Sequence, residues 1–179
     1  SRKFLWDAMN VNVNGNNVLC MSYYPKEGNP LWERYSTKLV AHTVKTYSKY
    51  TIDYPYPVAI SVHSKWIGME YPMICLLNVP DAYVLTHEIV HNWFYGIIGS
   101  NERDHAWMDE GLTDWFSNTI TNRSPVFEND FLDPVDQNAE LYKTTDAYFF
   151  AVYAKSQEWL RLLRNKTGQA NFEAGIKEY

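Results

Sequence analysis

A short run of the chain, His87-Glu88-Ile89-Val90-His91, has the residue types and the spacing of a zinc site. Residues four positions apart lie on one face of an α-helix, so His87 and His91 would present two imidazoles to one ion. A catalytic zinc binds histidine nitrogen and carboxylate oxygen and keeps its fourth position for water. Glu88 would be displaced around the helix, where its carboxylate reaches that water as a base. The run therefore predicts metal-assisted hydrolysis.

Glu110 is the third ligand that we expect for this zinc ion. Eighteen residues separate it from His91, and it lies in Met108-Asp109-Glu110-Gly111-Leu112 at the start of a second helical segment. Two histidines and one glutamate form a known catalytic zinc set. Asp114 lies four residues beyond Glu110, on the same helix face. It either accepts a hydrogen bond from the second nitrogen of a ligating histidine or is an exposed acidic position.

These side chains need two helices to hold them. Pro80-Asp81 is expected to open the first, with Asp81 as its N-cap, and this helix should run to about Tyr95 and end before Gly96. The second should begin at Asp104 or Asp109 and continue to about Ile120. A helix that only carries two surface histidines would be the alternative to a metal site, and the presence of a third ligand makes it less favoured.

The remaining pattern places strands before helices, which predicts an α+β fold with a small β-rich part followed by a mostly helical part. A β-hairpin is expected in residues 1–24 around the turn Asn14-Gly15-Asn16-Asn17. The other expected elements are a helix from Leu31 to about Tyr50, strands at 58–62 and 73–79, a loop at 121–135, and helices at 136–164 and from Gln169 onward.

Composition and charge limit the possible partners. The formal net charge of −5 argues against nucleic acid, which selects basic surfaces. Cys20 and Cys75 match no metal or redox spacing and are interpreted as two buried free thiols. Aromatic residues make up 16% of the chain, which suits either an aromatic-lined cleft or a surface that docks against other domains.

The two ends of the sequence resemble cut ends. Ser1-Arg2-Lys3 does not begin a signal peptide, and the chain stops at Tyr179 without a tail. No stretch approaches the ~18 apolar residues that would span a bilayer, so the segment is expected to be soluble. We expect a fragment of a longer protein whose targeting segment is absent, and the sequence does not indicate a location.

The zinc motif and Glu110 resemble those of the aminopeptidase N-like gluzincin zinc metallopeptidases. Gly68-Met69-Glu70-Tyr71-Pro72 is similar to the family's Gly-x-Met-Glu-Asn element. Val152-Tyr153-Ala154-Lys155-Ser156 is similar to its Val-Tyr-x-Lys-Gly segment. Lys3-Phe4-Leu5-Trp6-Asp7-Ala8 resembles the closing strand of the family's N-terminal β-domain. The resemblance covers nearly the whole chain, and the zinc motif is its most specific part.

This resemblance implies a thermolysin-like catalytic domain and a metalloprotease that hydrolyses the N-terminal peptide bond of peptides with a free N-terminus. The implied cofactor is Zn²⁺. The implied roles are zinc binding by His87, His91 and Glu110, water activation by Glu88, oxyanion binding by Tyr153, α-amine binding by Glu70, and further substrate contacts from Met69 and Gly68. The implied domains are residues 1–27 as the end of a preceding β-domain and 28–179 as the catalytic domain, completed by flanking domains.

The sequence also departs from the family pattern. Ile67 replaces the family's first glycine, Tyr71 replaces its asparagine and Ser156 replaces its last glycine. Tyr148 and Tyr142 are close enough in sequence to compete with Tyr153 for the oxyanion role.

Two rival functions remain open at this point. A zinc endopeptidase would use the same metal site without needing Glu70, and a non-catalytic domain would keep zinc only for stability. Because flanking domains would complete the cleft, we expect the 179 residues alone to be weakly active or inactive.

Overall fold

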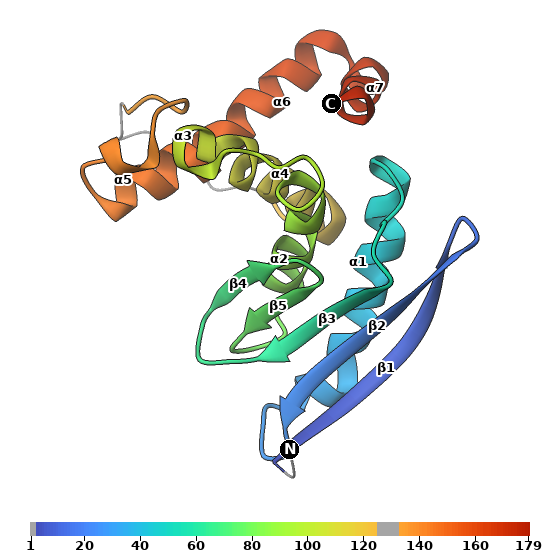
Figure 1. The fold of residues 1–179 in the computed structure, drawn as a ribbon. Coiled ribbons are helices and arrows are strands. Elements are labelled where there is room, and N and C mark those ends of the chain that lie inside the picture. The colour runs from blue at the N-terminus through green and yellow to red at the C-terminus, as the bar shows by residue number, and fades with distance from the viewer. Residues whose placement is uncertain (1–2, 125–132) are drawn as a thin grey trace. The chain divides into compact units, whose positions relative to one another are not determined.

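The structure is a computed structural model that describes residues 3–124 and 133–179. The chain divides into two compact units, which we call unit 1 (Ser1–Trp93) and unit 2 (Phe94–Tyr179). Unit 1 holds every strand among the described residues, and unit 2 is helical (Figure 1). The predicted α+β class, with a β-rich part followed by a mostly helical part, is therefore confirmed.

Unit 1 is built on one mixed sheet of five strands in the order β1-β2-β3-β5-β4. The β1–β2 and β4–β5 pairs are antiparallel, and the β2–β3 and β3–β5 pairs are parallel. Parallel neighbours need a crossover connection, which a helix supplies between β2 and β3. The strands are β1 (Phe4–Val13), β2 (Asn16–Pro25), β3 (Val58–His63), β4 (Gly68–Tyr71) and β5 (Ile74–Leu77).

The predicted hairpin is confirmed, and its turn explains its register. Asn14 and Gly15 both have positive φ, at 47° and 99°, which is the backbone of a two-residue turn that matches the twist of the strands. The Asn12 side chain accepts a hydrogen bond from the Gly15 amide at 3.1 Å and so stabilises the turn. The hairpin continues the same sheet as β3, β4 and β5, because β2 pairs with β3.

The crossover between β2 and β3 consists of a π-helical turn, η1 (Trp32–Ser36), and the helix α1 (Thr37–Tyr50). The predicted helix from Leu31 to Tyr50 is thus confirmed. Helix α1 packs against β1, β2 and β3. Its buried face, which includes Val40, Val44 and Tyr47, supplies much of the core of unit 1.

Helix α2 (Ala82–Phe94) carries the zinc motif. The Asp81 carboxylate accepts hydrogen bonds from the amides of Tyr83 at 3.0 Å and Val84 at 3.1 Å, so the predicted N-cap is confirmed. At the other end of the helix, Trp93 packs edge-on against Tyr47, with ring centroids 4.5 Å apart. The Trp93 indole nitrogen donates to the Ile52 carbonyl at 2.8 Å. Both ends of α2 are therefore fixed within unit 1.

Unit 2 consists of short and medium helices. Helix α4 begins at Glu110, directly after Asp109, which was one of the two predicted starts, and α3 and a 3-10 turn, η2, precede it. α4 packs against η4 and α6, and α6 packs against α7. The bounds are α3 (Glu102–His105), η2 (Ala106–Met108), α4 (Glu110–Thr121), η3 (Ala139–Leu141), α5 (Thr145–Phe149), η4 (Phe150–Lys155), α6 (Ser156–Thr167) and α7 (Gln169–Glu178).

The prediction of one helix over 136–164 is wrong in its first part. Asn138 accepts a hydrogen bond from the Glu140 amide at 2.9 Å, which favours the isolated 3-10 turn η3. Thr144 then accepts from the Ala147 amide at 3.1 Å and so caps the start of α5. Beyond α5 the chain is helical to Thr167, but η4 is π-helical. Residues 125–132 of the predicted loop lie outside the described residues.

None of the helices in the described part of the chain is long and apolar enough to cross a membrane. The division of the chain into the end of a preceding β-domain, residues 1–27, and a catalytic domain, residues 28–179, stays a prediction.

We expect the substitution Trp93→Ala to lower the free energy of unfolding by about 3–5 kcal/mol, because it removes a large buried ring and leaves a cavity. Trp93 is 2% exposed, whereas Trp66 in the same unit is 66% exposed. Trp66→Ala is therefore the matched control and should change stability little. Urea unfolding followed by circular dichroism measures both, and equal losses would contradict the assignment of Trp93 to the core.

Candidate metal and catalytic site

Two buried histidines face one another on helix α2. The Nε2 atoms of His87 and His91 lie 3.1 Å apart, and the rings meet edge-on with centroids at 4.7 Å. Their side chains are 8% and 2% exposed. Two nitrogens bound to one tetrahedral zinc at 2.0–2.1 Å would lie roughly 3.3 Å apart. The donor pair therefore fits a zinc ion with little movement.

Glu88 lies between these histidines in sequence and is also buried, at 6% exposed. Its carboxylate lies against the backbone of β4, because a Cβ atom added to Gly68 would lie 2.1 Å from Glu88 Oε1. Any side chain at position 68 would push this carboxylate away. The first residue of β4 thus has to be glycine if Glu88 is to keep its position.

Asn92 connects the zinc-motif helix to the turn between β4 and β5. Its side-chain oxygen accepts a hydrogen bond from the Met73 amide at 2.7 Å, and its side-chain nitrogen donates to the Ile89 carbonyl at 2.9 Å. Met73 has a φ of 66°, a left-handed conformation that this hydrogen bond stabilises. The β4–β5 turn is therefore held to α2 by one buried amide.

Glu70 and Met69 lie on β4 itself and are half-buried. Glu70 pairs in register with Cys75 of β5. The sequence alone did not single out Asn92 for positioning this segment. A buried amide directly after the second histidine would have been the signal for it.

Cys75 does not belong to the set of reactive groups. Burial raises the pKa of its thiol well above the ordinary value, and the nearby Glu88 carboxylate raises it further. Burial likewise raises the pKa of Cys20 to about 12. Both cysteines are buried free thiols, as predicted, and neither forms a thiolate near neutral pH.

In unit 2, Glu110 is the first residue of α4 and is half-buried. The N-terminus of a helix carries a partial positive charge, which favours an ionised carboxylate at this position. Gly111, directly after it, lies so close to α6 that an added Cβ atom would be 2.4 Å from Ser156 Cβ. The sequence offered no signal for this contact beyond the glycine itself.

Tyr153 is the tyrosine that contacts Glu110. Burial is the main cause that raises the pKa of its phenol, followed by the charge of Glu110 and a hydrogen bond to that carboxylate. Burial and the Glu110 charge also raise the pKa of Tyr148, whose ring centroid lies 6.2 Å from that of Tyr153. Both phenols therefore keep their protons near neutral pH.

Tyr142, the third candidate, is occupied elsewhere. Its hydroxyl lies 2.9 Å from the Pro134 carbonyl and 3.0 Å from the Val135 carbonyl, both of which accept its hydrogen bond. The candidates for the oxyanion role in unit 2 therefore narrow to Tyr153 and Tyr148.

Asp114 takes part in a buried network. Its Oδ2 accepts a hydrogen bond from Gln157 Nε2 at 2.6 Å, and Gln157 Oε1 accepts one from Asn118 Nδ2 at 2.6 Å. Asp114 is 5% exposed, so the alternative of an exposed acidic position is wrong. The network connects α4 to α6.

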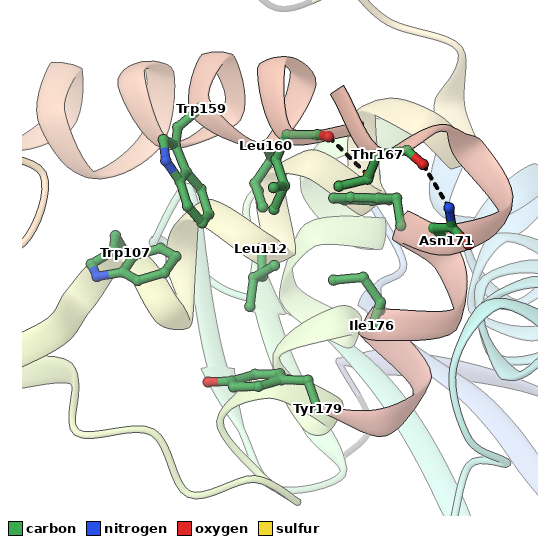
Figure 2. A pocket seen from close by; sticks show the side chains of 11 residues that line it. Trp107, Leu112, Trp159, Leu160, Thr167, Asn171, Ile176 and Tyr179 are labelled. Atoms are coloured by element: carbon green, nitrogen blue, oxygen red, sulfur yellow. Dashed lines mark hydrogen bonds between the residues drawn. The ribbon is translucent and has the colours of Figure 1, made fainter. Parts of the chain in front are cut away.

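The described site residues divide between the two units. Unit 1 brings His87, His91 and Glu88 together on α2 beside Gly68, Met69 and Glu70 of β4, and unit 2 brings Glu110 and Tyr153 together beside Asp114. A hydrophobic pocket of about 360 Å³ also lies in unit 2 (Figure 2). It is lined by side chains of η2, α4, α6 and α7, including Trp107, Trp159 and Phe172, and none of the site residues above is among them.

The buried network gives a stability prediction. Gln157→Leu should lower the free energy of unfolding by about 1–3 kcal/mol, because Asp114 loses a donor and Asn118 loses an acceptor inside the protein. Gln169→Leu is the control, since Gln169 is exposed in α7 and both of its side-chain hydrogen bonds are exposed to solvent. Urea unfolding measures both. An unchanged stability of Gln157→Leu would mean that the network contributes nothing.

The chain matches known proteins over most of its length. A model of the peptidase family M1 domain matches residues 78–179, more than half of the chain. The chain is 23% identical to the alanine/arginine aminopeptidase of Saccharomyces cerevisiae over 199 residues, covering 87% of this chain and 23% of that protein. It is 23% identical to aminopeptidase N of Lactococcus lactis over 172 residues, covering 70% of this chain and 20% of that protein.

Solved structures show the same fold. An M1 zinc metallopeptidase from Deinococcus radiodurans superposes with a TM-score of 0.75 at 15% identity, covering 98% of this chain and 44% of that one. Legionella pneumophila aminopeptidase A, solved with aspartic acid, gives a TM-score of 0.75 at 11% identity and covers 98% and 24%. The chain spans less than a quarter of the length of the curated relatives named above. On the match to residues 78–179, the chain belongs to peptidase family M1.

Proposed function

We propose that this chain carries the zinc-binding and catalytic segment of an aminopeptidase, which hydrolyses the N-terminal peptide bond of its substrates. The observation that carries the proposal is the pair of buried imidazoles on α2, whose Nε2 atoms are 3.1 Å apart. Membership of peptidase family M1 and the similarity to named aminopeptidases support the reaction class.

The proposed metal ligands are His87, His91 and Glu110. Nitrogen and carboxylate donors of this kind are the set that catalytic zinc prefers. When bound, zinc would polarise the scissile carbonyl and make water nucleophilic near neutral pH. Asp114 is proposed as an outer carboxylate of the site, although the bond that it accepts here comes from Gln157.

Glu88 is proposed as the general base. It would take a proton from the attacking water and pass it to the leaving amine. Its buried carboxylate lies against the β4 backbone at Gly68, which limits the directions in which it can move. A base held in this way loses little entropy when it reacts.

Tyr153 is proposed to donate its phenolic hydrogen to the oxygen of the scissile carbonyl as negative charge develops there. A donor for this role has to remain protonated at the working pH. Burial and the Glu110 carboxylate raise the pKa of Tyr153 and so provide that condition. The pKa of Tyr148 is raised as well, but the Glu110 carboxylate acts on Tyr148 through its charge alone, whereas it acts on Tyr153 through its charge and a hydrogen bond.

Glu70 is proposed to bind the free α-amine of the substrate, with Met69 and Gly68 contacting its first residue. The half-buried position of Glu70 on β4 leaves a carboxylate that a cation can reach. Recognition of a free amine is what would make the enzyme an exopeptidase. We further propose that residues 1–27 end a preceding β-domain and that flanking domains complete the substrate cleft.

Zinc binding provides the first test. His91→Ala should weaken zinc binding by more than about 100-fold, since loss of an outer partner alone costs 10–100-fold and this change removes a ligand. His42→Ala is the matched control, because His42 is exposed on α1. Competition titration with a chromophoric chelator measures both affinities. Equal zinc affinity in the two variants would contradict the metal site.

Peptide hydrolysis provides the second test. Glu88→Gln should lower kcat by about 10²–10⁴-fold while zinc binding is retained, because the amide cannot accept the proton. Glu27→Gln, on an exposed residue of the same unit, is the control. The assay should use the longest available form of the protein, since we expect weak turnover by the 179 residues alone.

The same assay separates the aminopeptidase from its rival. Peptides with a free N-terminus should be cleaved and their N-acetylated counterparts should not, and Glu70→Ala should raise KM for the free peptides. Cleavage of both peptide forms at similar rates would instead support an endopeptidase.

A further inference from the structure

Helices α4 and α6 approach one another so closely that only a glycine fits at the crossing. A Cβ atom added to Gly111 would lie 2.4 Å from Ser156 Cβ, 2.9 Å from Ser156 Oγ and 3.1 Å from the Val152 carbonyl oxygen. Gly111, Val152 and Ser156 are all buried. Neither a Cβ atom nor a backbone carbonyl can rotate away, so an added side chain would have to move one helix.

The contact between Gly111 and Ser156 lies directly beside Glu110 and Tyr153, the two residues of unit 2 with proposed chemical roles. Glu110 precedes Gly111 in sequence, and Tyr153 precedes Ser156 by about one helical turn. The Glu110 carboxylate and the Tyr153 phenol lie close to one another. A displacement of α4 from η4 and α6 at Gly111 would therefore directly change the distance between the Glu110 carboxylate and the Tyr153 phenol.

The helix segment that carries Tyr153 is itself tightly held. Ser156 Oγ donates to the Ala151 carbonyl at 3.3 Å, and Ala151 and Val152 are fully buried. Residues Phe150–Lys155 form a π-helical stretch, a local widening that often occurs at functional sites. Beyond it, Gln157 binds Asp114 of α4 at 2.6 Å. The Gly111–Ser156 contact and the Gln157–Asp114 bond thus fix two successive turns of α4.

We propose that Gly111 and Ser156 are positioning residues, which set the separation of α4 and η4 so that Glu110 and Tyr153 stand at the distance that the metal site needs. The proposal rests on the proposed function, because it assigns Glu110 to zinc. Neither Gly111 nor Ser156 would touch the ion or the substrate.

The contact also implies a rule for the two positions. With glycine at 111, the crossing has room for the Cβ atom of Ser156, but it has no room for two Cβ atoms. It follows that an alanine at 111 should be tolerated once position 156 becomes glycine, apart from a small adjustment at the Val152 carbonyl.

The test is a compensation experiment on zinc affinity. Gly111→Ala should weaken zinc binding by about 10–100-fold, the range for residues that orient metal ligands. The double variant Gly111→Ala with Ser156→Gly should recover most of that loss, and Gly111→Ala with Ser156→Ala should not, because the second Cβ atom remains. Gly175→Ala, where an added Cβ atom meets nothing within 4 Å, is the matched control and should leave zinc affinity unchanged.

A zinc-free measurement separates this proposal from the proposed function. The ¹³C chemical shift of the Tyr153 ring can be assigned by comparison with Tyr153→Phe. It should change in Gly111→Ala and return toward the wild-type value in Gly111→Ala with Ser156→Gly. If the wild-type chain binds no zinc, the proposed function fails, and the ring shift still decides the role of the contact.

The outcomes that overturn the proposal are equally definite. Zinc affinity and ring shift unchanged in a folded Gly111→Ala variant would show that the contact does not position the pair. If Gly111→Ala does not fold, the two double variants decide. The double variants carry Gly111→Ala together with either Ser156→Gly or Ser156→Ala. If both fail to fold, or if both fold with the same zinc affinity and ring shift, the Cβ–Cβ contact is excluded as the cause of the Gly111→Ala defect.

Discussion

Placing two imidazoles and a carboxylate on one short stretch of a buried helix is the constraint on which unit 1 depends. Polar groups that are removed from water are costly unless they have partners or bind a metal. Helix α2 carries these polar groups in the interior, and both of its ends are held in place, one by the Asp81 cap and the other by the packing of Trp93. The strand that lies against Glu88 must accordingly begin with a residue that has no side chain, and Gly68 meets that need.

In unit 2, the constraint is that the phenols of Tyr153 and Tyr148 stay protonated close to the Glu110 carboxylate. Burial raises the pKa of Tyr153 and of Tyr148, and the Glu110 charge acts in the same direction on both. Such phenols resist ionisation and remain donors over a wide pH range. This arrangement requires α4 to stay close to α6, with Gly111 at the crossing and the Asp114–Gln157 bond one turn along.

Much of this arrangement could be predicted from the sequence where a local rule decides the structure. The Asn14-Gly15 turn and the Asp81 cap are set by neighbours within a few residues, and both predictions are confirmed. The continuous helix over 136–164 was not, because helical periodicity does not reveal that Asn138 and Thr144 side chains bind the backbone and start new elements.

For the site, the residue types and the spacing of His87, Glu88 and His91 indicated the metal chemistry, and the family match supports it. What the sequence could not show were the residues that act through packing or long-range hydrogen bonds. Asn92 binds a turn 19 residues away in sequence, and Gln157 binds Asp114 at a separation of 43. Neither partner can be identified without knowing which segments lie side by side.

The two cysteines have a practical consequence for studying the protein. Both thiols lie in the sheet of unit 1, Cys20 on β2 and Cys75 on β5, and both are essentially inaccessible. Since burial also suppresses their ionisation, a thiol reagent can modify them only when the sheet opens. The chain thus contains a native reporter of the opening of the sheet that lies against Glu88 of α2, and it needs no engineered label.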